Sequence, residues 1–188
     1  MYISIGVDCW MADFLQKHDL RTLAFPFDWV VTYQGVSRCI ETKFRQFLPF
    51  KDRINPYHMY FHHDFKENLS QDAKKYERRC HRFLDCLNRE EIVFCRKGHA
   101  CHHHEEHEVT SDVEDAERLA QILTRDYPRL RYRIIVILVC DKCFDPTKTY
   151  HSDHIEIYNI ATPSADPEKF EQLCRTLFLG ETSGSAVN

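Results

Sequence analysis

Strand-length apolar runs alternate with helix-length stretches along the second half of the sequence, and this alternation most limits the fold. The run Tyr132–Cys140 is the most hydrophobic and is typical of a central strand. Shorter strand-like runs are Glu91–Cys95 before it and His154–Ile160 after it. With a further strand at Tyr2–Val7, the pattern predicts an α/β fold in which helices flank a mostly parallel sheet as a three-layer sandwich.

Helical periodicity predicts five helices that cover this sheet. They span Trp10–His18, Gly35–Leu48, Ser70–Asn88, Ser111–Tyr127 and Asp166–Phe178. Between the predicted elements, Arg96–Thr110 is polar and predicts a loop. No linker or internal repeat interrupts the chain, so we expect one domain over residues 1–180 and a flexible polar tail over residues 181–188.

Composition argues against several classes of protein. The net charge of -4 argues against general nucleic-acid or anionic-membrane binding. The longest apolar run, Ile134–Cys140, is far short of the roughly 20 residues that a membrane span needs. Nine cysteines at irregular spacing, without a signal peptide, predict reduced thiols in the cytoplasm.

Cys9 stands between the first predicted strand and the first predicted helix. Ligands of parallel sheets collect at the carboxyl ends of the strands, where Cys9, Arg96 and Cys140 all fall. A helix N-terminus favours the thiolate, although Asp8 opposes it if its carboxylate points at the sulfur. The residues alone leave two interpretations open, a reactive nucleophile and a buried structural thiol.

Six short motifs follow one another in order between residues 2 and 140. They are Ser4-Ile5-Gly6-Val7-Asp8-Cys9, Leu20-Arg21, Pro26-Phe27-Asp28-Trp29, His63-Asp64-Phe65, Arg78-Arg79-Cys80-His81-Arg82-Phe83 and Ile92-Val93-Phe94-Cys95-Arg96. In this combination the chain resembles a domain family of unknown function described as papain-like cysteine peptidases, found in bacteria and large DNA viruses.

The resemblance implies a peptidase-like cysteine hydrolase or acyltransferase that acts on a peptide or protein. Cys9 is then the nucleophile that forms a thioacyl intermediate, and His63 is its base, with His62 as a competitor. Asp28 or Asp64 orients the imidazole. The papain label implies a papain-like α+β fold as the alternative to the α/β sandwich. A viral origin implies the host cytoplasm.

Three residues are candidates for binding the substrate: Trp29, Arg82 and Arg96. Arg82 shares a helix face with Arg78, and Arg96 ends a predicted strand. Guanidinium groups suit carboxylate or phosphate, so an anionic substrate group fits here. The alternative interpretation is a solvated face that pairs with acidic neighbours such as Glu77.

We expect no cofactor, with zinc as the alternative, because two clusters of cysteine and histidine suit this metal. Cys140 and Cys143 end the central strand, and His151 and His154 open the next, so these four candidate ligands can meet across the connection. The histidines between residues 99 and 107 indicate a metal-binding surface loop. A non-catalytic interaction module, with host modulation as its viral form, and a metal- or redox-responsive protein remain alternatives to the hydrolase.

Overall fold

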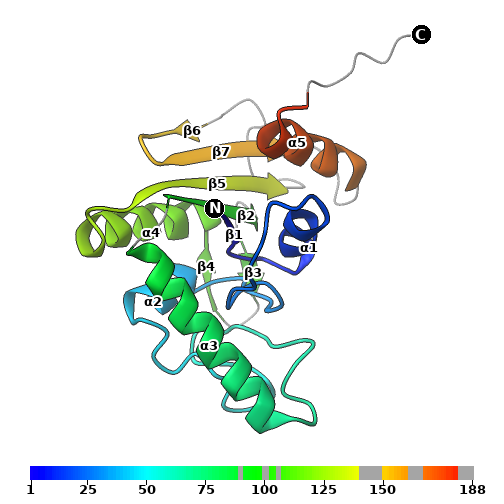
Figure 1. Ribbon diagram of the computed structural model, residues 1–188, viewed down its shortest axis with the longest axis vertical. Coiled ribbons are helices and arrows are strands. Elements are labelled where there is room, and N and C mark those ends of the chain that lie inside the picture. The colour runs from blue at the N-terminus through cyan, green and yellow to red at the C-terminus, as the bar shows by residue number, and fades with distance from the viewer. Residues whose placement is uncertain (89–90, 99–101, 105–106, 140–149, 161–166, 182–188) are drawn as a thin grey trace.

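The computed structural model describes residues 1–88, 91–98, 102–104, 107–139, 150–160 and 167–181 (Figure 1). Its main sheet has the order β1-β2-β5-β7-β6. These strands are β1 (Tyr2–Ser4), β2 (Glu91–Gly98), β5 (Arg131–Val139), β7 (Ile155–Ile160) and β6 (Tyr150–His151). The first four run parallel, and β6 pairs antiparallel with β7. The α/β prediction is thereby confirmed over the α+β alternative. Of the predicted tail, residues 182–188 lie outside the described residues.

Alternate side chains of the sheet face two helical layers. The helices are α1 (Trp10–Lys17), α2 (Val36–Glu41), α3 (Leu69–Leu87), α4 (Asp112–Asp126) and α5 (Pro167–Leu179). Ile134 and Val136 of β5 belong to the core that packs under α2, α3 and α4. Ile135 and Ile137 belong to the core under α1 and α5. In Figure 1, α1 and α5 lie together at the right, and α2, α3 and α4 lie to the left of them and below. Four of the five predicted helices match to within one residue at each end.

The second predicted helix, Gly35–Leu48, is wrong beyond Glu41. The backbone takes left-handed conformations at Lys43, Phe44 and Gln46. These turns carry Phe44 and Phe47 into an aromatic cluster, where their rings lie 5.6 and 5.9 Å from that of Phe27. Burial of both rings therefore overrides the helical pattern in this segment.

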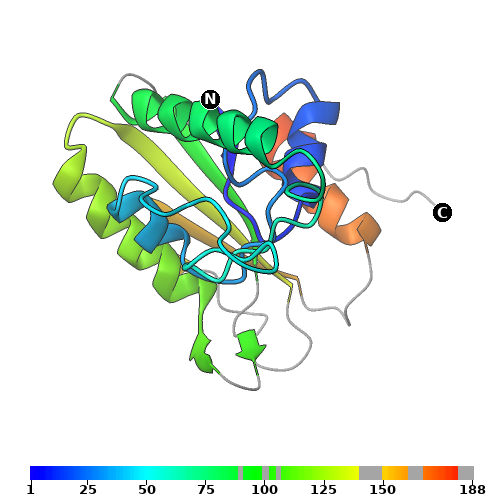
Figure 2. The same cartoon turned by 90° about the horizontal axis from the view of Figure 1, so that it is seen from below.

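The segment Arg96–Thr110, predicted as a loop, is also partly wrong. Strand β2 continues to Gly98, and a separate antiparallel pair follows, β3 (His102–His104) with β4 (His107–Thr110). Figure 2 shows this hairpin beyond the carboxyl ends of the parallel strands. The carboxyl edge of the sheet is thus where β1 leads to Cys9 and where β2 leads to the histidine-bearing hairpin.

Candidate functional site

Cys9 is the N-cap residue of α1, and its carbonyl accepts a hydrogen bond from the Asp13 amide at 3.0 Å. Of the six described cysteines, all free thiols, Cys9 alone is partly exposed, while five are buried: Cys39, Cys80, Cys86, Cys95 and Cys174. Burial raises the pKa of Cys80 to about 12. It also raises the pKa of Cys39, Cys95 and Cys174. Among the described thiols, Cys9 is therefore the one best placed to react.

The turn that leads to Cys9 depends on Gly6, whose φ is +97°. A Cβ at this position would lie 1.6 Å from Oγ1 of Thr32. The next residue, Val7, donates its amide to the Lys97 carbonyl at 2.9 Å and accepts the Thr32 amide at 2.8 Å. The backbone before Cys9 is therefore clamped between β2 and the segment around Thr32.

Asp8 and Lys97 form an ion pair beside Cys9. One oxygen of Asp8 accepts the Trp10 amide at 2.9 Å, and the other lies 3.0 Å from Nζ of Lys97. The ammonium also lies 5.9 Å from the Trp10 ring centroid and 5.5 Å from that of Phe170 on α5. Sequence reasoning missed Lys97. The signal that could have found it is a second cation at the carboxyl end of β2.

Arg96 is buried, with 2% of its surface exposed. Its Nε donates to Oδ1 of Asp112 at 2.7 Å, and its Nη1 donates to the Ile5 carbonyl at 2.6 Å. Its Nη2 donates to the Thr32 carbonyl at 2.8 Å. Because protein groups occupy the guanidinium, this geometry favours a structural role over the predicted substrate contact.

Asp28 is buried in the segment of residues 25–29, here called the aromatic loop, and is paired with Arg21. Its Oδ2 also accepts the Phe25 amide at 2.8 Å, whereas its Oδ1 has no hydrogen-bond partner in the described part of the chain. Burial raises the pKa of Asp28, against the opposing effects of Arg21 and the Phe25 amide. Asp28 therefore holds the turn that precedes Trp29.

His63 is exposed, and its ring centroid lies 6.0 Å from that of Trp29 at right angles. A backbone bridge between Val31 and Tyr60, with hydrogen bonds of 2.9 and 3.0 Å, brings the two segments side by side. The His62 ring packs 4.8 Å from His63. The structure thus brings together the predicted base and one predicted substrate-binding residue.

Both aspartates of the predicted triad bind groups outside the triad. Asp64 accepts hydrogen bonds from Lys75 at 2.6 Å and from the Tyr76 hydroxyl at 2.7 Å. Within the described residues, no hydrogen bond joins the Cys9 thiol to His63, and none joins His63 to Asp28 or Asp64. Both aspartates instead fix the loops on either side of the Trp29–His63 contact.

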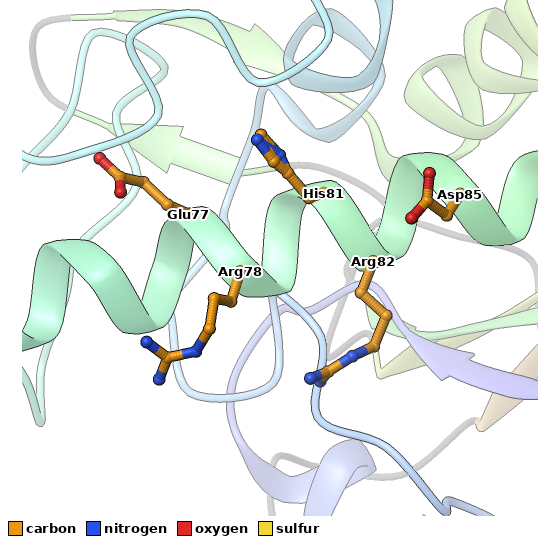
Figure 3. A pocket seen from close by; sticks show the side chains of 5 residues that line it. All are labelled: Glu77, Arg78, His81, Arg82 and Asp85. Atoms are coloured by element: carbon orange, nitrogen blue, oxygen red, sulfur yellow. The ribbon is translucent and has the colours of Figure 1, made fainter.

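Arg82 lines a shallow depression of about 520 Å³ on the outer face of α3. Figure 3 shows Arg78 and Arg82 on one side of the helix and three other side chains on the opposite side: Glu77, His81 and Asp85. Nη1 of Arg82 also donates to the Ala24 carbonyl at 2.6 Å, which ties α3 to the aromatic loop. The depression carries charges of both signs.

Only part of the predicted zinc site, formed by Cys140, Cys143, His151 and His154, lies within the described residues. Cys140 and Cys143 lie outside the described residues, and His151 is described as strand backbone only. The ring of His154 stacks on Tyr132 at a centroid distance of 4.3 Å. Among the described side chains, no group of three or more suits a metal ion.

Comparison with known proteins gives one match. A family model described as "Putative papain-like cysteine peptidase (DUF1796)" matches residues 1–56 and 50–142. No curated protein and no solved structure matches the chain. In the described part of the chain, no helix is long and apolar enough to cross a membrane.

Proposed function

The chain belongs to this papain-like cysteine peptidase family, and on that premise we propose that it is a cysteine hydrolase with Cys9 as nucleophile. One observation carries the proposal: Cys9 is a partly exposed thiol at the N-terminus of α1, at the carboxyl edge of a parallel sheet. Such edges are where ligands of α/β folds bind. The five other described thiols are buried.

The proposed reaction is acyl transfer through sulfur. The Cys9 thiolate attacks the acyl carbon, and the C–N bond breaks as the leaving amine takes a proton from the His63 imidazolium. Water then hydrolyses the thioester, with His63 accepting its proton. The amides that follow Trp10 in the first turn of α1 are suitable donors to the oxyanion, because the first turn of a helix leaves amides without a partner inside the helix. The reaction requires the loop that carries His63 to approach Cys9 when substrate binds.

Asp28 supports this reaction through the aromatic loop. It fixes the turn before Trp29, and the Trp29 ring lies against His63. Trp29 is our candidate for an apolar substrate contact, and Arg82 with Arg78 is our candidate for an anionic group of the substrate. A peptide or protein is the substrate class.

Iodoacetamide labelling near neutral pH, resolved by mass spectrometry of peptides, tests the nucleophile. We expect Cys9 to react faster than every other thiol, and Cys9→Ser to abolish turnover of a mixed fluorogenic peptide library. His63→Ala should remove turnover and slow the labelling, with His62→Ala as the matched control. Uniform slow labelling of all thiols contradicts the proposal.

A non-catalytic interaction module is the second candidate. The absence of a Cys9–His63 hydrogen bond among the described residues favours it. A folded chain that labels slowly at Cys9 and turns over no substrate would support this candidate. A metal-responsive protein is a weaker candidate, and less than one zinc per tag-free chain in metal analysis would remove it.

A further inference from the structure

We propose that Lys97 is a positioning residue that keeps Cys9 nucleophilic by neutralising Asp8. This inference rests on the proposed role of Cys9 and assigns a function to a residue that the family motifs do not include. Asp8 directly precedes Cys9 in the chain, and its negative charge disfavours a neighbouring thiolate. The ion pair with Lys97, at 3.0 Å, offsets that charge.

The position of Lys97 is fixed by contacts from three elements. Its backbone amide donates to the Gly6 carbonyl at 3.2 Å, and its carbonyl accepts the Val7 amide at 2.9 Å. Its ammonium lies against the ring of Trp10 on α1 and the ring of Phe170 on α5. The two aromatic rings also pack edge to face at 4.5 Å. The charge is therefore held at the Cys9 turn.

Asp8 contributes in two opposite ways. Its carboxylate accepts the amide of Trp10, the first residue of α1, at 2.9 Å, which orders the turn that carries the thiol. The same carboxylate places a negative charge on the residue that precedes Cys9 in the chain. Lys97 compensates this charge while the hydrogen bond to the Trp10 amide remains. The side chain of Lys97 is 23% exposed and that of Asp8 is 36% exposed, so the pair acts where a substrate can also reach.

Site-resolved alkylation of Cys9 by iodoacetamide at pH 7 tests the proposal. The reagent is uncharged, so its own attraction to Lys97 does not enter the rate. We expect Lys97→Gln to slow alkylation about fivefold, because loss of the ammonium leaves the charge of Asp8 uncompensated. Lys97→Arg keeps the charge and should stay close to the wild-type rate.

The double variant decides whether Lys97 acts through Asp8. Asp8→Asn keeps an oxygen for the Trp10 amide but removes the charge. We therefore expect Asp8→Asn/Lys97→Gln to recover most of the rate that Lys97→Gln loses. A double variant as slow as Lys97→Gln overturns the proposal, and so does a Lys97→Gln variant that reacts at the wild-type rate.

Two controls keep the outcome interpretable. Lys17→Gln removes a lysine from the other end of α1, where it pairs with Asp13 at 2.7 Å, and should leave the Cys9 rate unchanged. If Lys97→Gln does not fold, Asp8→Asn alone still tests the proposal, because it should accelerate alkylation, and an unchanged or slower rate overturns it. The alkylation readout needs no substrate, so a chain without peptidase activity can still pass or fail it.

Discussion

Arg96 and Lys97 are consecutive cations at the end of the same strand, yet they lie in opposite environments. Arg96 faces the layer of α2, α3 and α4, is buried and pairs with Asp112. Lys97 faces α1 and α5, is partly exposed and pairs with Asp8 beside Cys9. The alternation of side chains along a strand is enough to produce this separation.

The two ion pairs differ in what they do for the protein. In the interior, an unpaired charge costs far more than a well-made pair contributes, so Arg96 makes the fold depend on Asp112. Near the surface, an ion pair contributes little to stability. The role that we propose for Lys97 is therefore its electrostatic effect on Asp8 and Cys9 rather than a contribution to stability. The difference teaches that position on the strand, rather than charge, separates a structural residue from a functional one.

Loss of the buried pair should have the largest effect. Arg96→Met leaves Asp112 charged and buried and removes the Arg96 hydrogen bonds to the Ile5 and Thr32 carbonyls, so we expect a loss of about 3–5 kcal/mol in the free energy of unfolding. Urea denaturation measures it. Arg131→Gln, which breaks an exposed pair with Glu91 at 3.1 Å, is the control and should cost less than about 1 kcal/mol. If Arg96→Met is as stable as this control, Arg96 is not the structural residue that the comparison requires.

Gly6 connects the two environments, because a Cβ there would lie 2.8 Å from Nη1 of Arg96 and closer still to Thr32. We expect Gly6→Ala to destabilise the protein by about 3 kcal/mol, from both the clash and the left-handed backbone. Gly180→Ala is the matched control, since Gly180 also has positive φ, but an added Cβ there meets no atom within 4 Å among the described residues beyond its chain neighbours. Equal losses in the two variants would show that backbone conformation alone accounts for the effect.

Substitution of Lys97 should affect the reactivity of Cys9 more than the stability of the fold. Lys97→Gln should cost less than about 1 kcal/mol of stability in urea, because its ion pair is partly exposed. In the same variant, the rate at which iodoacetamide alkylates Cys9 should nevertheless fall. A stability loss as large as that of Arg96→Met would mean that Lys97 is also a structural residue, and the contrast between the two cations would fail.

Periodicity was sufficient for most of the fold. The central position of β5 and the ends of four helices follow from apolar spacing, because each of these elements buries one regular face. The segment after Glu41 has the same helical spacing but puts Phe44 and Phe47 into an irregular turn. Spacing cannot reveal this, since the partner ring of Phe27 lies far away in sequence.

The candidate site was only partly predictable. The position of Cys9 at a strand-to-helix turn could be predicted, because it depends on local pattern. The partners of the charged residues could not. Arg96 pairs with Asp112, which is 16 residues away in the sequence, and Lys97 pairs with Asp8, which is 89 residues away. Both pairings depend on which face of β2 each side chain lies on. They also depend on which acidic residue lies near the helix that packs on that face.

The smallest expected effect concerns Asp28, a buried carboxylate paired through one oxygen only. Burial raises its folded pKa above the ordinary value of 3.8, so the folded state binds this proton more tightly than the unfolded state. Between 3.8 and the raised value, stability should therefore fall as pH rises. Asp28→Asn removes this dependence, so the stability of the wild type relative to the variant should increase as pH falls from 7 to 4 in urea titrations. Asp126 has the opposite sign, because Arg125 lowers its pKa, and Asp126→Asn is the control. A difference between wild type and Asp28→Asn that stays constant with pH would mean that Arg21 and the Phe25 amide offset the desolvation of Asp28 in full.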